Sequence, residues 1–237
     1  NSSEKAIIEY PDGANILYDF KNDKQVTLPT HWKEFEFAPN EDKIVAKSMG
    51  LDTENRWLTI SNADGSNAKY IEHLGEKDLT VYTSWSPNNQ TIAMFTEGKG
   101  LDKQEVYFVG QNDENFKSAT IEGRGFQPLW SPDGSLLLYS VYSTENGMKP
   151  SLWVVSAQGD SIGTGRKSIG LETWANKCSF YNSSIAYCAV PKSLEDGSGL
   201  FPELAETSSD IIYKINVITA NKAIIAVPET DTTVKNI

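Results

Sequence analysis

The 237-residue sequence is short of the residues that most often hold metal ions. It contains two cysteines, Cys178 and Cys188, and two histidines, His31 and His73. A tetrahedral zinc site made of cysteine and histidine would need nearly all four on facing elements, and their spacing resembles no metal motif. We therefore expect no metal site, and we expect no cofactor.

Positive charge is also scarce. Asp and Glu total 32 against 21 Lys and Arg, which gives a formal net charge of −11. Nucleic-acid binding uses Lys and Arg to displace counterions from phosphate, and anionic membranes attract the same residues. The composition argues against a nucleic-acid partner and against docking on anionic lipid, whereas an acidic surface is typical of a soluble protein.

Long apolar runs are absent as well. No run approaches the roughly 20 residues that a helix needs to cross a bilayer, so we expect no membrane insertion in this segment. The chain begins Asn1-Ser2-Ser3 without a methionine or a signal peptide. We interpret this as a mature, processed or truncated start, and the segment can belong to a longer chain. The missing signal peptide therefore leaves the compartment open.

One pattern is abundant, a strand–turn–strand unit that occurs four times. Its copies begin at Phe37, Trp85, Trp130 and, in degenerate form, Cys178, at intervals of about 45 to 48 residues. Apolar residues alternate before each turn, and proline with asparagine or aspartate forms the turn in the first three copies. A more continuous apolar run follows, which is typical of a strand buried on both faces. Each copy therefore predicts a β-hairpin.

Two further strands follow each hairpin, such as Trp57–Ile60 and Ala68–Ile71 in the first copy. Four strands in about 45 residues is the period of a β-propeller blade. No 3.6-residue periodicity extends beyond two turns, so we expect almost no helix. The predicted fold class is all-β, a β-propeller of four-stranded antiparallel blades.

The chain is out of phase with its repeat. Residues 6–28 supply only the later strands of a partial blade, and residues 231–237 either start the next blade or close the first. The alternatives are a five-bladed ring and a segment of a larger propeller, and we favour the segment because 231–237 is short. We assign residues 1–237 to one propeller domain or segment, with complete blades at 31–75, 79–123, 125–170 and 173–229.

The repeat resembles that of the TolB-like β-propeller family. The resemblance lies in Trp130-Ser-Pro-Asp-Gly134, the apolar run from Leu136 to Val141, and Leu152-Trp153 with Gly159, and Trp85-Ser-Pro87 is a second match. It covers residues 31–229 in four copies and is specific for the fold rather than for function. The fourth copy, from Lys177-Cys178 to Tyr187-Cys188, is similar to a subgroup of uncharacterised bacterial propeller proteins.

The resemblance implies a site of action and a class of function. Such repeats occur in periplasmic translocation partners, in bacterial lipoproteins and surface proteins, and in the propeller domains of prolyl-oligopeptidase-like peptidases. We expect an extracytoplasmic bacterial protein, periplasmic, secreted or anchored at the cell surface. We expect it to be no enzyme but a binding or scaffold module for a protein, peptide or glycan. The alternative is an enzyme-associated propeller, either gating a peptidase or carrying glycan-active carboxylates.

Candidate binding residues come from propeller geometry. The first strands of the blades begin on the rim where the second-to-third strand loops lie, and these loops are long, including Pro191 to Ser209. Long loops on a rigid scaffold often carry binding residues, and aromatic and charged groups around a concavity suit a ligand site. We select from these strand starts and this loop the residues Trp32, Lys33, Asp78, Arg124, Glu172, Trp174, Leu200 and Phe201.

Catalytic motifs are weaker. Gly159-Asp160-Ser161-Ile162-Gly163 matches the nucleophile-elbow pattern, but it falls in a turn between two strands and no histidine follows it. Carboxylate pairs for glycoside hydrolysis could come from Glu34, Glu36, Asp78 and Glu172, and their separation would decide that chemistry. We therefore assign no catalytic residue.

Cys178 and Cys188 flank the fourth hairpin, and its register decides whether they pair. With a four-residue turn, Cys178 faces Ile185 and Cys188 points to the opposite face. With a three-residue turn centred on Ser183, Cys178 lies opposite Cys188 within disulfide range. This copy lacks the proline and glycine of the others, so we favour the disulfide, which needs an oxidising compartment. The alternative is two small core residues.

Overall fold

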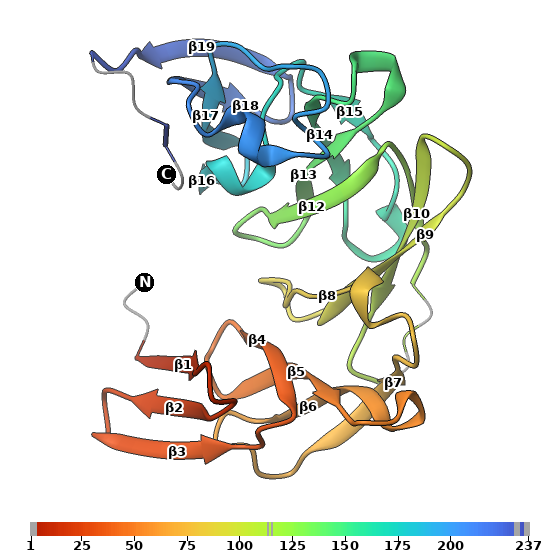
Figure 1. The fold of residues 1–237 in the computed structure, drawn as a ribbon, viewed down its shortest axis with the longest axis vertical. Helices are drawn as coiled ribbons and strands as arrows, with labels where there is room; N and C mark the ends of the chain where they lie inside the picture. The colour runs from red at the N-terminus through yellow and green to blue at the C-terminus, as the bar shows by residue number, and fades with distance from the viewer. Residues whose placement is uncertain (1–3, 113, 115, 230–232, 235–237) are drawn as a thin grey trace. The chain divides into compact units, whose positions relative to one another are not determined.

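The structure, a computed structural model, describes residues 4–112, 114, 116–229 and 233–234. This part of the chain contains strands β1 to β19 and short 3-10 helices η1 to η6, and it has no α-helix. No helix in it is long and apolar enough to cross a membrane. The strands form one three-stranded and four four-stranded antiparallel sheets, each a meander of neighbours in sequence (Figure 1).

The strand bounds follow the repeat. The three-stranded sheet contains β1 (Lys5–Glu9), β2 (Asn15–Asp19) and β3 (Lys24–Leu28). The next two contain β4 (Trp32–Phe37), β5 (Lys43–Met49), β6 (Arg56–Asn62) and β7 (Lys69–His73), then β8 (Val81–Thr83), β9 (Ala93–Gly98), β10 (Lys103–Val109) and β11 (Ala119–Glu122). The last two contain β12 (Arg124–Trp130), β13 (Leu136–Tyr142), β14 (Pro150–Ser156) and β15 (Lys167–Ser168), then β16 (Cys178–Asn182), β17 (Ile185–Pro191), β18 (Asp210–Asn216) and β19 (Asn221–Ala226).

The 3-10 helices lie in the connections between strands. They are η1 (Thr53–Asn55), η2 (Asp78–Thr80), η3 (Thr144–Asn146), η4 (Gly159–Ser161), η5 (Ala175–Lys177) and η6 (Pro202–Ala205). The prediction of an all-β propeller with four four-stranded blades and a partial blade is confirmed. Of the predicted last strand at 231–237, only Thr233 and Val234 belong to the described residues, and neither is in a strand.

The chain divides into two compact units. The first contains the residues up to Phe95 together with Phe108–Phe116, and the second contains Thr96–Tyr107 and the residues from Lys117 on. In the first unit, Ile44 and Val45 of β5 are both fully buried and belong to different apolar clusters. In the second, the consecutive residues Leu137 and Leu138 of β13 are both buried, and Leu138 shares an apolar cluster with Cys188 of β17. The second strands are thus covered on both faces, as their continuous apolar runs predict.

The repeated hairpin turn has a defined hydrogen-bond pattern. Between β12 and β13 the Ser131 hydroxyl donates to Asp133 Oδ1 (2.7 Å) and accepts from the backbone N–H of Leu136 (2.9 Å). Partial desolvation opposes ionisation, but hydrogen bonds from Ser131 and Ser135 lower the pKa of Asp133 to about 2. Ser86 makes the same pair of bonds, to Asn88 Oδ1 and from Thr91 N–H, between β8 and β9.

The fourth hairpin departs from the prediction that Cys178 is equivalent to Trp130. Trp130 pairs with Leu137, the second residue of β13, whereas the residue opposite Ala186, the second residue of β17, is Phe180. Phe180 therefore takes the place of Trp130, and Cys178 lies two residues earlier. The reason is a different and shorter connection, with five residues between Phe180 and Ala186 against six between Trp130 and Leu137, and without the Ser-Pro-Asp-Gly type of turn.

This shorter hairpin brings the two cysteines together. Cys178 pairs directly with Cys188, with a Cα–Cα distance of 4.1 Å and a disulfide between the sulfur atoms. Asn182 pairs with Ile185, so the turn contains two residues rather than the predicted three, and a register shift at Tyr181 takes up the difference. The predicted disulfide is confirmed, and the predicted turn length is wrong.

Candidate binding site

A pocket of about 630 Å³ opens in the second unit. Its walls come from β12, from the segment that leads into β16, and from the loop between β17 and β18. Residues near the end of the described chain complete it. The lining residues are Gln127, Trp174, Asn176, Lys177, Pro202, Glu203, Ala205, Glu206, Thr233 and Val234.

Trp174 is fixed in the pocket by its neighbours. Thr173 donates its hydroxyl proton to the carbonyl of Ala189 (2.6 Å), and the N–H of Ala175 donates to Ser140 Oγ (3.0 Å). These bonds tie the segment before β16 to β17 and β13 on either side of Trp174, which is 7% exposed. The indole is therefore a rigid, largely buried wall.

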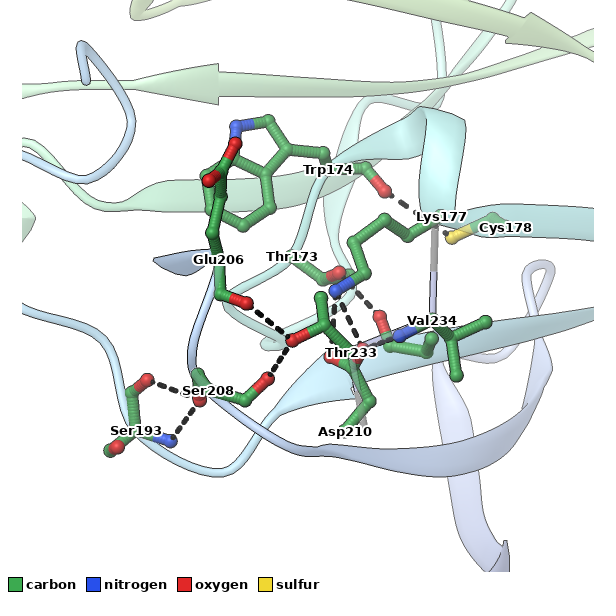
Figure 2. A network of polar contacts seen from close by, with 11 residues as sticks. Thr173, Trp174, Lys177, Cys178, Ser193, Glu206, Ser208, Asp210, Thr233 and Val234 are labelled. Atoms are coloured by element: carbon green, nitrogen blue, oxygen red, sulfur yellow. Dashed lines mark hydrogen bonds and ion pairs between the residues drawn. The ribbon is translucent and has the colours of Figure 1, made fainter. Parts of the chain in front are cut away.

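A buried ion pair lies beside this tryptophan (Figure 2). Lys177 Nζ is 2.7 Å from Asp210 Oδ1 and 2.8 Å from Oδ2, and the two residues are 6% and 0% exposed. Asp210 is the first residue of β18, where it pairs with Pro191 of β17. The charges neutralise each other inside the protein, which leaves the charge of the pocket mouth to other residues.

Thr233 and Val234 contact the same network (Figure 2). The Thr233 hydroxyl lies 2.9 Å from the carbonyl oxygen of Glu206 and 2.7 Å from that of Ser208. The backbone N–H of Val234 donates to Asp210 Oδ2 (2.6 Å). Three successive acceptors on alternate residues of the loop and β18 are thus engaged by two residues from near the end of the chain.

The loop of residues 192–209 is anchored but leaves an apolar lip. Gly197 and Gly199 donate their N–H groups to the carbonyls of Gly147 and Met148, both at 2.8 Å. A side chain at Gly199 would collide with Tyr142 and with the Met148 carbonyl, so this approach requires glycine. Leu200, Phe201 and Leu204 remain 46%, 51% and 42% exposed. We call these three residues the apolar lip.

The mouth of the pocket carries negative charge. Glu203 and Glu206 line it, both are exposed, and neither carboxylate forms an ion pair among the described residues. The amides of Gln127 and Asn176 add donors and acceptors to the wall. The site therefore combines an aromatic wall, neutral amides and two acids, which suits a ligand with apolar and cationic groups.

Of the predicted binding residues, the structure brings together Trp174 and the loop that holds Leu200 and Phe201. Trp32 lies elsewhere, packed in the core of the first unit and 4% exposed. Lys33 is 4.0 Å from a carboxylate oxygen of Glu9. Trp32 and Lys33 therefore contact other residues of the first unit.

Asp78 and Arg124 are also engaged by protein groups. The Asp78 carboxylate is 3.3 Å from Arg56 Nη1. Arg124 donates to the carbonyls of Gly100 and Leu101. Glu172 is exposed.

The carboxylates considered for glycoside hydrolysis differ in their surroundings. Glu34 forms an ion pair with Lys47, whose Nζ lies 2.7 Å from a carboxylate oxygen. Glu36 keeps an exposed surface on β4, and partial desolvation by the protein around its carboxyl raises its pKa to about 7. Ser161, of the nucleophile-elbow pattern, lies in η4 and donates its hydroxyl proton to the Gln158 carbonyl (2.6 Å), within a turn and not at a strand-to-helix elbow.

Sequence reasoning missed Lys177, Asp210, Gln127 and Asn176. A charged residue next to an apolar strand, as in Asp210 before Ile211, is the one signal that marks the buried pair. Its partner is 33 residues away in the sequence, and nothing in the local pattern joins the two.

Comparison with known proteins places the fold in a class. No protein-family model and no curated protein matches the sequence. The solved structures that match include TolB and a protease β-propeller domain, and the resemblance to TolB-like propellers is confirmed for the fold. The chain is a β-propeller of this architecture.

Three of these structures define the similarity. TolB from Acinetobacter baumannii has a TM-score of 0.58 and 12% identity, over 92% of this chain and 50% of that one. The β-propeller domain of the Trilobed protease from Pyrococcus furiosus has a TM-score of 0.57 and 9% identity, over 91% and 67%. Pyrococcus horikoshii acylaminoacyl peptidase has a TM-score of 0.59 and 7% identity, over 93% and 36%. The chain thus spans about half the length of TolB.

Proposed function

We propose that the protein is a non-catalytic binding propeller for a protein, peptide or glycan partner. The observation that carries this proposal is the pocket beside Trp174. The loop of residues 192–209 lines this pocket and also holds the exposed apolar lip. Exposed apolar side chains grouped beside a concavity are typical of interaction sites. The similar solved structures support the propeller fold. The proposed binding role rests on the pocket and the apolar lip.

We also propose that the protein acts outside the cytoplasm. The disulfide between Cys178 and Cys188 supports this location, because disulfides persist in oxidising compartments and are rare in the cytosol. Mass spectrometry of protein alkylated without reduction tests it. Two labelled thiols in protein isolated from its native cells would argue for a reducing compartment.

Replacing the apolar lip tests the binding function. The variant Leu200→Ser/Phe201→Ser is compared with wild type on an array of random peptides and on an array of glycans. We expect at least a tenfold loss of signal, with a melting temperature within about 2 °C of wild type because the side chains are exposed.

A matched control uses two exposed leucines in other strand connections, Leu51 and Leu101, which are 101% and 83% exposed. The variant Leu51→Ser/Leu101→Ser should bind like wild type. A large fall in the melting temperature of the lip variant would show instead that the lip is a structural cover.

A second candidate is a propeller domain that serves an enzyme, by gating a peptidase or by carrying glycan-active carboxylates. It is supported by the similarity to the β-propeller domain of the Pyrococcus furiosus Trilobed protease and to Pyrococcus horikoshii acylaminoacyl peptidase. Sequencing the complete reading frame tests the first form, since an α/β-hydrolase domain in the same chain would favour gating. Release of reducing sugars that depends on Glu36 would favour the second.

A further inference from the structure

The contacts of Thr233 and Val234 show how the loop edge beside the pocket receives a polypeptide. The acceptors are the carbonyls of Glu206 and Ser208 and the carboxylate of Asp210, on every second residue of the chain. Glu206 and Ser208 belong to the loop that precedes β18, so two loop carbonyls and one side-chain carboxylate here accept hydrogen bonds from another segment of polypeptide. Lys177 holds the Asp210 side-chain carboxylate in place, and this carboxylate accepts a hydrogen bond from the backbone N–H of Val234.

We propose that this edge and the pocket together bind an extended, basic peptide segment of a partner protein. We further propose that Thr233 and Val234 occupy part of the site as an internal ligand. The inference rests on the proposed binding function and names the class of ligand. Hydrogen bonds to an extended peptide contribute affinity, and neighbouring pockets give specificity through side chains.

The remaining pocket groups suit the other parts of such a peptide. The carboxamides of Gln127 and Asn176 can each donate to and accept from a peptide backbone. Trp174, with Pro202 and Ala205, offers an apolar surface for one side chain. The pocket thus holds complements for both the backbone and an apolar side chain of the ligand.

Charge favours a basic ligand. The carboxylates of Glu203 and Glu206 line the pocket without an ion pair among the described residues. A lysine or arginine side chain that reaches the mouth would gain charge-assisted hydrogen bonds with them. In the sequence, Lys235 follows Thr233 and Val234 and Asp231 precedes them, so the chain's own segment carries one basic residue directly after the two that contact the site.

A synthetic peptide with the sequence of residues 230–237 is the probe, labelled with fluorescein and measured by polarisation against the full chain. Its lysine is replaced by glutamate in a matched second probe. The internal segment is tethered and so present at high effective concentration, so wild-type protein should bind the probe weakly. The variant Thr233→Val/Val234→Pro removes the hydroxyl and the N–H that engage the edge.

This variant should bind the lysine probe with a Kd at least tenfold lower than that of wild type. Adding Glu203→Gln/Glu206→Gln should raise the Kd again by at least tenfold, and the glutamate probe should bind at least tenfold more weakly. Thr207, an exposed threonine of the same loop, supplies the control. Thr207→Val should leave the Kd unchanged.

Two results would overturn the proposal: no gain in affinity in the folded Thr233→Val/Val234→Pro variant, or equal binding of the two probes. If the proline change prevents folding, Thr233→Val alone still removes the hydroxyl, and the two glutamine changes still test charge. Glycan binding that depends on the apolar lip, without peptide binding, would leave the proposed function standing and reject this inference alone.

Discussion

The blade β4–β7 and the blade β16–β19 each contain a buried lysine, and the two lysines have different partners. Lys47 is 3% exposed, and its ammonium lies 2.7 Å from a carboxylate oxygen of Glu34 and 2.7 Å from the Asp78 carbonyl. Lys177 is 6% exposed and binds both carboxylate oxygens of Asp210. The first lysine divides its bonds between a charged and a neutral group, whereas the second is matched by one charge.

The exposure of the partners distinguishes the pairs further. The Glu34 side chain is 56% exposed, and that of Asp210 is 0% exposed. Glu34 therefore returns to water if its lysine is removed, while Asp210 would remain as an unpaired charge inside the protein. A buried pair is costly to break on one side, even where its formation adds little to stability. The comparison predicts unequal effects for the same substitution in the two blades.

The largest expected effect is that of Lys177→Met. Removing the ammonium leaves Asp210 buried and uncompensated, which costs about 3–5 kcal/mol of unfolding free energy. Chemical denaturation at neutral pH measures this loss. The exposed Lys214 on β18 is the control, and Lys214→Met should change stability by less than about 0.5 kcal/mol.

A double variant sharpens this prediction. Lys177→Met/Asp210→Asn removes both charges and should be more stable than Lys177→Met alone, because no ion remains in the interior. A double variant that is less stable than the single one would show that hydrogen bonds from Asp210, and not its charge, dominate this site.

Removal of the disulfide comes next in size. The blade β16–β19 is cross-linked across a sequence separation of 10 residues, and β4–β7 has no cysteine. Loop-closure entropy predicts that Cys178→Ala/Cys188→Ala loses about 2–3 kcal/mol. Denaturation of wild type and variant with and without a reducing agent measures it. Reduction should destabilise the wild type and leave the variant unchanged, and equal responses would contradict the cross-link.

Lys47→Met should cost less than Lys177→Met, about 1–3 kcal/mol. Its loss leaves the Asp78 carbonyl without the lysine and lets Glu34 return to solvent, so the cost is that of an unsatisfied acceptor. The measurement is again the unfolding free energy at neutral pH. Equal costs for the two lysine variants would break the comparison, since the partners' exposure would then have no effect.

The smallest expected effect is a pH dependence at Glu36 of β4. Desolvation raises the pKa of Glu36 to about 7, above the value of about 4.3 in an unfolded chain. Between these values the unfolded state loses the proton more readily, so stability from this group declines as pH rises and stays low above pH 7. Glu36→Gln should therefore melt higher than wild type at pH 8 and at the same temperature at pH 4. An equal difference at both pH values would exclude ionisation of Glu36 as its cause.

The blades could be predicted because their information is local and repeated. The Ser-Pro-Asp-Gly turn encodes its own hydrogen bonds, from Ser131 to Asp133 and from Leu136 to Ser131. Alternating and continuous apolar runs then distinguish the first strand from the second. Because the same signal occurs in four copies, the prediction of the blade architecture is better supported than the assignment of any single strand.

The fourth hairpin shows where local reasoning weakens. The missing proline and glycine correctly indicated a changed turn, and the cysteines do lie opposite each other. The register shift at Tyr181 had no signal in the sequence, so the equivalence of Cys178 with Trp130 was wrong. Pairing is decided by how β16 fits the core beside β17, which a short stretch of sequence does not specify.

The sequence by itself determined the blade fold and the near absence of helix, because each depends on patterns among neighbours a few residues apart. Only the tertiary structure decided that Trp32 is core while Trp174 lines a pocket, and that Lys177 meets Asp210. Those outcomes depend on strand register and on the path of residues 192–209, which bring together groups 33 residues apart. Charge pairing and burial act through space, so a side chain's role is fixed by what the folded chain places beside it.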